Sequence, residues 1–121
     1  MKKPWDMRER TLDFAVRVLD IVERLPRGVG PRKVAGQLAE SGTSIGANYH
    51  EADTALTGPD KRKSLVTSRK EAQETSYWLK IVQRKWGTRV EVGADIEEVG
   101  ELVAILNRMI NNLDKRIRAA S

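Results

Sequence analysis

The sequence predicts an all-α protein, an antiparallel up-down-up-down four-helix bundle, from three observations. Apolar residues recur at spacings of three and four in four long segments, as in helices with one buried face. Breaks rich in Pro and Gly separate these segments, and each break is short. Short loops between long helices place neighbouring helices antiparallel. With 121 residues the chain can bury one core, so we expect a single domain over residues 1–121.

The first predicted helix spans residues 6–25. Apolar residues at alternating spacings of four and three predict its buried stripe: Phe14, Val18, Ile21 and Leu25. A second apolar set widens this stripe: Leu12, Val16, Leu19 and Val22. On the other face three aspartates each precede an arginine by four residues, which favours helical ion pairs: Asp6 and Arg10, Asp13 and Arg17, Asp20 and Arg24. We expect that face to be solvated.

The second predicted helix spans residues 32–56 and follows a loop that contains Pro26, Gly28, Gly30 and Pro31. Small residues dominate its buried seam: Val34, Leu38, Ser41, Ile45, Asn48, Ala52 and Ala55. Gly42 and Gly46 lie one turn apart inside it, and each costs about 1 kcal/mol relative to Ala in a helix interior. Close packing against another helix explains them. A phosphate-cradling loop is rejected, because the Gly-Lys-Ser/Thr ending and a preceding strand are missing.

The third and fourth predicted helices span residues 59–86 and 95–118. Pro59 suits the first turn of a helix, and Asp60 complements the positive end of its dipole. Asp95 is the expected N-cap of the last helix, with Glu98 three residues later, as in a capping box.

Chemistry-bearing residues are few, so we expect no enzymatic activity, no cofactor and no metal. The chain contains no cysteine and one histidine, His50, which we expect at a surface or interface. A di-iron bundle needs Glu-x-x-His pairs, which are absent. One carboxylate site remains conceivable, although exposure, or ion pairs with the Lys and Arg of the third helix, is the favoured explanation of its members: Glu51, Asp53, Glu71 and Glu74.

The distribution of hydrophobic residues predicts a cytoplasmic protein. No apolar run approaches the roughly 20 residues that span a bilayer. The start of the chain leads directly into charged sequence, without the apolar region of a signal peptide. We therefore expect no membrane partner.

The formal net charge of +5 favours an acidic partner, because bound Lys and Arg release counterions from phosphate backbones. Residues 59–90 contain nine Lys/Arg and three Asp/Glu, whereas residues 91–107 contain five Asp/Glu and no Lys/Arg. Such segregated charge suits RNA or DNA, or a neighbouring subunit. The candidate nucleic-acid-binding residues are Lys61, Arg62, Lys63, Arg69 and Lys70. Three tryptophans are either packing residues or stacking platforms for unpaired bases: Trp5, Trp78 and Trp86.

Two motifs carry a family resemblance. The first is Ser-Gly-Thr-Ser-Ile-Gly-Ala-Asn-Tyr-His-Glu-Ala at residues 41–52, and the second is Glu-Ala-Gln-Glu-Thr-Ser-Tyr-Trp-Leu at residues 71–79. Together with Asp-Phe-Ala-Val at residues 13–16, they make the chain resemble the bacterial four-helix bundle proteins named after the 23S rRNA intervening sequence. The resemblance covers nearly the whole chain.

This resemblance implies a homopentameric ring with basic surface around a central opening. It also implies kinship with the accessory variability proteins of diversity-generating retroelements, which bind a reverse transcriptase and nucleic acid. Two functions remain open. One is a ring-shaped adaptor that binds RNA or DNA and a partner protein such as a reverse transcriptase. The other is a structural oligomeric module that docks a protein and binds no nucleic acid.

Overall fold

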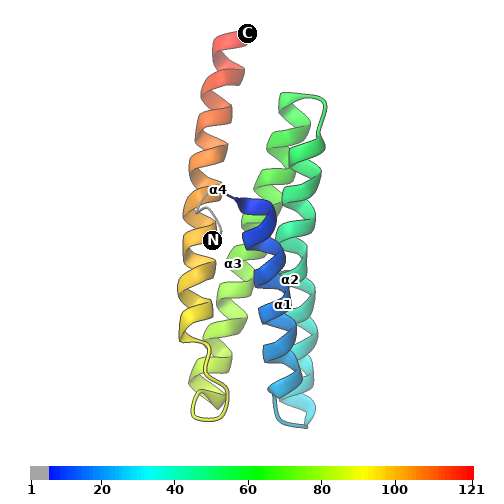
Figure 1. Cartoon of the computed structure of the whole chain (residues 1–121), viewed down its shortest axis with the longest axis vertical. Coiled ribbons are helices and arrows are strands. Elements are labelled where there is room, and N and C mark those ends of the chain that lie inside the picture. The colour runs from blue at the N-terminus through cyan, green and yellow to red at the C-terminus, as the bar shows by residue number, and fades with distance from the viewer. Residues whose placement is uncertain (1–5) are drawn as a thin grey trace.

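The computed structural model describes residues 6–121, and these form four helices joined by short loops (Figure 1). In chain order the helices are α1 (Met7–Arg24), α2 (Val29–Thr54), α3 (Gly58–Trp86) and α4 (Gly93–Ala120). They run alternately up and down, so the α1–α2 and α3–α4 loops lie together at one end and the α2–α3 loop lies at the other (Figure 1). The predicted all-α four-helix bundle is confirmed.

One hydrophobic core cluster joins the four helices. Large side chains that are almost fully buried come from every helix: Phe14, Leu38, Leu79 and Leu106. The α2–α3 contact is the most extensive and the α1–α4 contact the least. α1 is the shortest helix, with 18 residues, and it covers only part of the length of the bundle (Figure 1). No helix within residues 6–121 combines the length and apolarity needed to cross a membrane.

Helix α2 differs from its prediction at both ends. It begins at Val29, three residues early, after Gly28, whose positive φ of 135° favours glycine. Pro31 therefore lies in the first turn, where a proline removes no helical hydrogen bond. The helix ends at Thr54, because Ala55 has an extended backbone.

The prediction that Asp95 caps α4 is wrong. The helix starts two residues earlier, at Gly93, and its N-cap is Val92, which offers no side-chain hydrogen bond. Asp95 instead lies inside the first turn and is buried, with 8% exposure. Its Oδ1 accepts a hydrogen bond of 2.8 Å from the Nε of Arg17 on α1. The carboxylate is thus used for a contact between helices.

Part of the α1 face that was expected to be solvated meets α4 instead, whereas Asp20 and Arg24 at its end are exposed as expected. Arg10 donates two hydrogen bonds to Glu98, from Nη2 to Oε1 at 2.7 Å and from Nε to Oε2 at 3.0 Å. This bond to Glu98 is the main reason that the pKa of Arg10 is raised. Arg17 contacts Asp95 through Nε and Nη2, which both lie 2.8 Å from the same oxygen, Oδ1. The smallest helix contact in the bundle is therefore reinforced by charge, and the pattern of pairs four residues apart did not reveal this.

Candidate functional site

The glycine motif of α2 serves helix packing. A Cβ on Gly42 would lie 2.6 Å from Cγ1 of Val18, and a Cβ on Gly46 would lie 2.9 Å from Oγ1 of Thr11. Both distances are shorter than real Cβ contacts, so only glycine lets α1 approach α2 this closely. The prediction of close packing is confirmed.

Buried hydroxyl groups bridge the α2–α3 contact, and one pair joins the two motifs. Ser68 Oγ donates to the carbonyl oxygen of Ile45 at 2.7 Å, and Thr75 Oγ1 lies 2.9 Å from Ser41 Oγ. Ser68 and Thr75 have no exposed surface. The buried residues of the two motifs therefore lie at helix contacts, where Gly42, Ile45 and Thr75 contribute to the packing of α1, α2 and α3.

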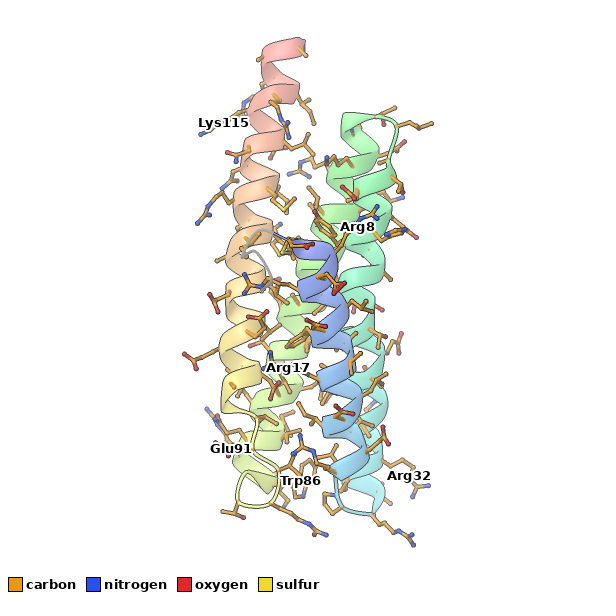
Figure 2. All side chains as sticks on the ribbon, in the orientation of Figure 1. Arg8, Arg17, Arg32, Trp86, Glu91 and Lys115 are labelled. Atoms are coloured by element: carbon orange, nitrogen blue, oxygen red, sulfur yellow. The ribbon has the colours of Figure 1, made fainter. Side chains whose placement is uncertain are left out.

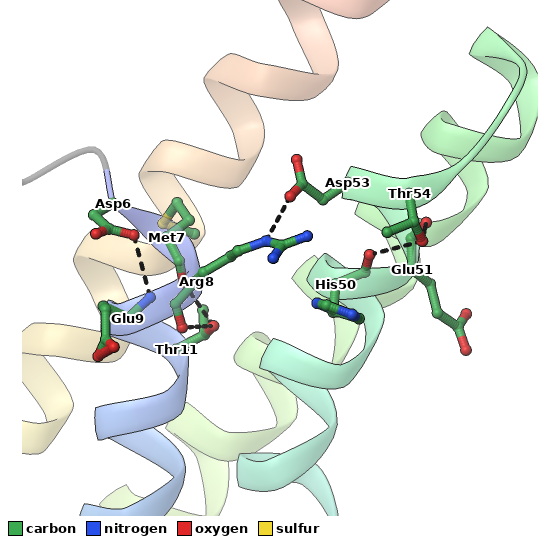
Figure 3. Close-up of polar contacts among 9 residues, drawn as sticks. All are labelled: Asp6, Met7, Arg8, Glu9, Thr11, His50, Glu51, Asp53 and Thr54. Carbon is green, nitrogen blue, oxygen red and sulfur yellow. Dashed lines mark hydrogen bonds and ion pairs between the residues drawn. The ribbon is translucent and has the colours of Figure 1, made fainter.

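A surface groove runs between α1 and α2, next to the contact at Gly46. It has a volume of about 380 Å³ and is lined by Arg8, Glu9, Thr11, Leu12, Ala15, Thr43, Gly46, Ala47 and His50. Figure 3 shows its upper edge, where Arg8 Nε donates to Oδ2 of Asp53 at 2.6 Å. The side chain of His50 is exposed, which agrees with its expected surface position.

An apolar strip continues from this groove along α1. Leu12, Val16 and Leu19 are 58%, 52% and 42% exposed, and they follow one another by four and three residues on one helix face. They were predicted to widen the apolar stripe of α1, and the core of this chain leaves them uncovered. We call these three residues the α1 strip.

The four carboxylates considered as a site do not converge. Asp53 is paired with Arg8 near the end of α2, and Glu51 is exposed two residues earlier, on a different side of the helix. Glu71 and Glu74 lie on α3 beside Glu40, and burial followed by the charge of Glu74 raises the pKa of Glu71. Within residues 6–121 no group of three His, Cys, Asp or Glu could hold a metal ion.

The five predicted nucleic-acid-binding residues spread over different faces of α3. Arg62 pairs with Asp114 of α4 at 2.6 Å, which lowers the pKa of Asp114, and Arg69 donates to Oδ1 of Asn107 at 2.8 Å. The three lysines line three separate hollows: Lys61 beside α4, and Lys63 and Lys70 beside α2. Their role in binding stays a prediction.

The tryptophans that the structure describes pack against the core. Trp78 and Trp86 are both half-buried, and the ring of Trp78 meets that of Tyr77 edge-on at 5.1 Å. Trp5 lies outside the described residues. Tyr77 is the aromatic side chain that stands out, with 60% exposure, and sequence reasoning did not single it out.

Sequence reasoning did not group the cations at the loop end of the bundle, although four of them are among the nine Lys/Arg counted in residues 59–90. Eight exposed Lys and Arg side chains flank the α1–α2 and α3–α4 loops: Arg24, Arg27, Arg32, Lys33, Lys80, Arg84, Lys85 and Arg89. Figure 2 labels Arg32 at this end. Residues 24–33 and 80–90 contain no Asp or Glu. These two carboxylate-free stretches, combined with the up-down topology, are the signal that could have identified the set.

Comparisons with known proteins agree with the resemblance. The model of the family described as 23S rRNA-intervening sequence protein matches residues 3–112. A similar solved structure is a protein of unknown function from the S23 ribosomal protein family of Bacteroides thetaiotaomicron. Its TM-score is 0.75 at 33% sequence identity, and the match covers 86% of this chain and 97% of that one. No curated protein matches the chain.

Proposed function

The chain belongs to the 23S rRNA-intervening sequence protein family, and from that premise we propose that it is a non-enzymatic, ring-forming scaffold that binds nucleic acid and holds a partner protein beside it. The observation that carries the proposal is the α1 strip. Three large apolar side chains on one exposed helix face form a surface that favours burial against another protein.

The occupant that we propose for the α1 strip is a second copy of this chain. The strip lies along α1 beside the groove, so a neighbouring subunit can pack side-on against both features. A contact between two different faces of the same chain closes into a ring when the rotation between copies divides a full turn. The family resemblance favours five subunits.

Light scattering in moderate salt tests the self-association. The parent is expected to have the mass of five chains, and the variant Leu12→Gln/Val16→Gln is expected to dissociate. The matched control is Val29→Gln, which replaces an apolar side chain that is 81% exposed and lies away from the α1 strip. A monomeric parent, or a variant that keeps the parent mass, would contradict the proposal. Because both replaced side chains are exposed, helix content measured by circular dichroism should stay unchanged.

Nucleic-acid binding is the second half of the proposal, and an excess of exposed cations supports it. Contacts made by Lys and Arg to phosphates release counterions, so log affinity should fall linearly with log salt. The alternative, a structural module that only docks a protein, predicts no saturable binding to RNA or DNA at any salt concentration. A mobility-shift titration over a range of salt concentrations separates the two.

The third part of the proposed function is the partner protein. The resemblance suggests a reverse transcriptase, and co-purification of the ring with a reverse transcriptase from the same genome tests this. The non-enzymatic role is supported by the lack of cysteine and by a single exposed histidine, which leave few residues for acid–base or covalent catalysis.

A further inference from the structure

The loop end of the bundle carries exposed Lys and Arg side chains that take no part in ion pairs between helices. The α1–α2 and α3–α4 loops both lie at that end (Figure 1), and the eight exposed cations named above lie in these loops or in the helix turns that flank them. We call these eight residues the basic end. Asp20, Glu23 and Glu91 are the carboxylates nearest to them in the chain.

No residue of the basic end forms an ion pair with any residue of the described range 6–121. Arg24 donates to a backbone oxygen, that of Asp20, at 3.3 Å. By contrast Arg10, Arg17 and Arg62 are bound to carboxylates on other helices. The cations of the basic end therefore repel one another, and no carboxylate among the described residues offsets that repulsion through an ion pair.

Helix stability explains only a minority of this set. Arg84 and Lys85 lie in the last turn of α3, where the negative end of the helix dipole favours cations. Arg32 and Lys33 lie close to the N-terminus of α2, where the dipole disfavours them, and the first turn of α2 contains no acidic residue. Mutual repulsion disfavours these cations, and the helix dipole also disfavours the two on α2. Their presence therefore indicates a negatively charged ligand.

We infer that the basic end is the surface on which the proposed scaffold binds the phosphate backbone of nucleic acid. This inference rests on the nucleic-acid half of the proposed function. The cations cover two loops and three helices, so they suit a long polyanion better than a single small anion. Five of the eight are arginines, whose planar guanidinium groups bind phosphate through two hydrogen bonds.

A lipid surface fits the basic end less well. Within residues 24–33 and 80–90, Val29 is the one large apolar side chain that is exposed. Peripheral membrane binding combines basic residues with an apolar face that enters the bilayer, and one valine supplies little such area.

A ring would strengthen this site. Cyclic symmetry places the same feature of every subunit at the same level along the ring axis, so all basic ends would lie on one face of the ring. Several weak phosphate contacts would then act together through effective concentration. The C-terminal turns of α4 extend past the α2–α3 loop at the opposite end (Figure 1), which leaves that side for a protein partner.

Two variants with equal loss of charge test the site in the full-length assembled protein. The loop-end variant carries Arg27→Gln, Arg32→Gln, Arg84→Gln and Arg89→Gln. The control variant carries Lys61→Gln, Lys63→Gln, Lys70→Gln and Lys115→Gln, and so includes three of the residues predicted from sequence. The probes are a short single-stranded RNA, a DNA duplex of the same length and vesicles that contain phosphatidylserine. Circular dichroism and light scattering verify that fold and mass are unchanged.

The loop-end variant is expected to bind RNA and DNA about tenfold or more weakly at low salt, with a smaller dependence of log Kd on log salt. The control is expected to stay within about threefold of the parent. Equal losses in the two variants, or a larger loss in the control, would overturn the inference. Tighter binding of the parent to vesicles than to RNA would overturn it in favour of a lipid surface. If the parent binds no nucleic acid, the nucleic-acid half of the proposed function fails, and this inference fails with it.

Discussion

Gly42 of α2 lies directly against the side chain of Val18 on α1. A Cβ at Gly42 would come within 2.6 Å of Cγ1 and 2.8 Å of Cγ2 of Val18, which has no exposed surface. A valine side chain has one strongly preferred rotamer in a helix, so it cannot rotate away from an added methyl group. The spacing of α1 and α2 therefore depends on this glycine.

Gly42→Ala should destabilise the protein. The substitution gains about 1 kcal/mol of helix propensity, but overpacking a rigid core typically costs about 1–3 kcal/mol. We expect a net loss of roughly 1 kcal/mol in urea unfolding. The control is Gly36→Ala on the same helix, where an added Cβ meets nothing within 4 Å and stability should rise. A stabilised Gly42→Ala variant would show that Val18 can move.

Ser68→Ala should weaken the α2–α3 contact. The substitution removes the hydrogen bond to the carbonyl of Ile45, a buried bond worth about 1 kcal/mol. The control Ser76→Ala lies on the same helix and reports the gain in helix propensity alone. Unfolding in urea should show Ser68→Ala less stable than Ser76→Ala by about 1 kcal/mol. Equal stability of the two variants would mean that the buried hydroxyl contributes nothing.

Asp95→Asn should loosen α1 from α4. The amide keeps the size of the side chain but removes the charge that Arg17 meets at 2.8 Å, and hydrogen bonds to charged groups contribute about 1.5–3 kcal/mol. Hydrogen exchange of α1 amides should accelerate more than that of α2 amides. Glu97→Gln removes an exposed charge from the same turn and controls for the helix dipole. Unchanged exchange in α1 would indicate that apolar contacts alone hold it.

Glu71→Gln should stabilise the protein at neutral pH. Burial and the nearby Glu74 raise the pKa of Glu71 above its ordinary value of 4.5 in the folded state. The folded protein therefore binds this proton more tightly than the unfolded chain, so the contribution of Glu71 to stability is fully present below pH 4.5 and is lost as pH rises through the raised pKa. The neutral amide avoids this loss. Thermal melts should separate the variant from the parent at pH 7 and converge near pH 4, and a constant difference would contradict this origin.

The sequence by itself determined the helices and the family. Four amphipathic stripes, with Pro and Gly at the breaks, predict four helices because burial of one face and backbone termination are local properties of the chain. Gly42 and Gly46 predicted close packing, because a glycine inside a helix is unfavourable unless another backbone approaches it. The start of α2 was predicted three residues too late, because Pro31 is as compatible with the first turn of a helix as with a loop.

Only the tertiary structure decided which charged side chains form ion pairs between helices and which of the described ones stay exposed without such a pair. Arg10 and Arg17 match partners four residues away in sequence, yet they reach Glu98 and Asp95 on another helix. Arg62, which was predicted to bind nucleic acid, forms an ion pair with Asp114. The basic end exists because the topology brings residues 24–33 and 80–90 together. Charge interacts through space, so its partners depend on how helices are placed, which the spacing of residues along one helix does not specify.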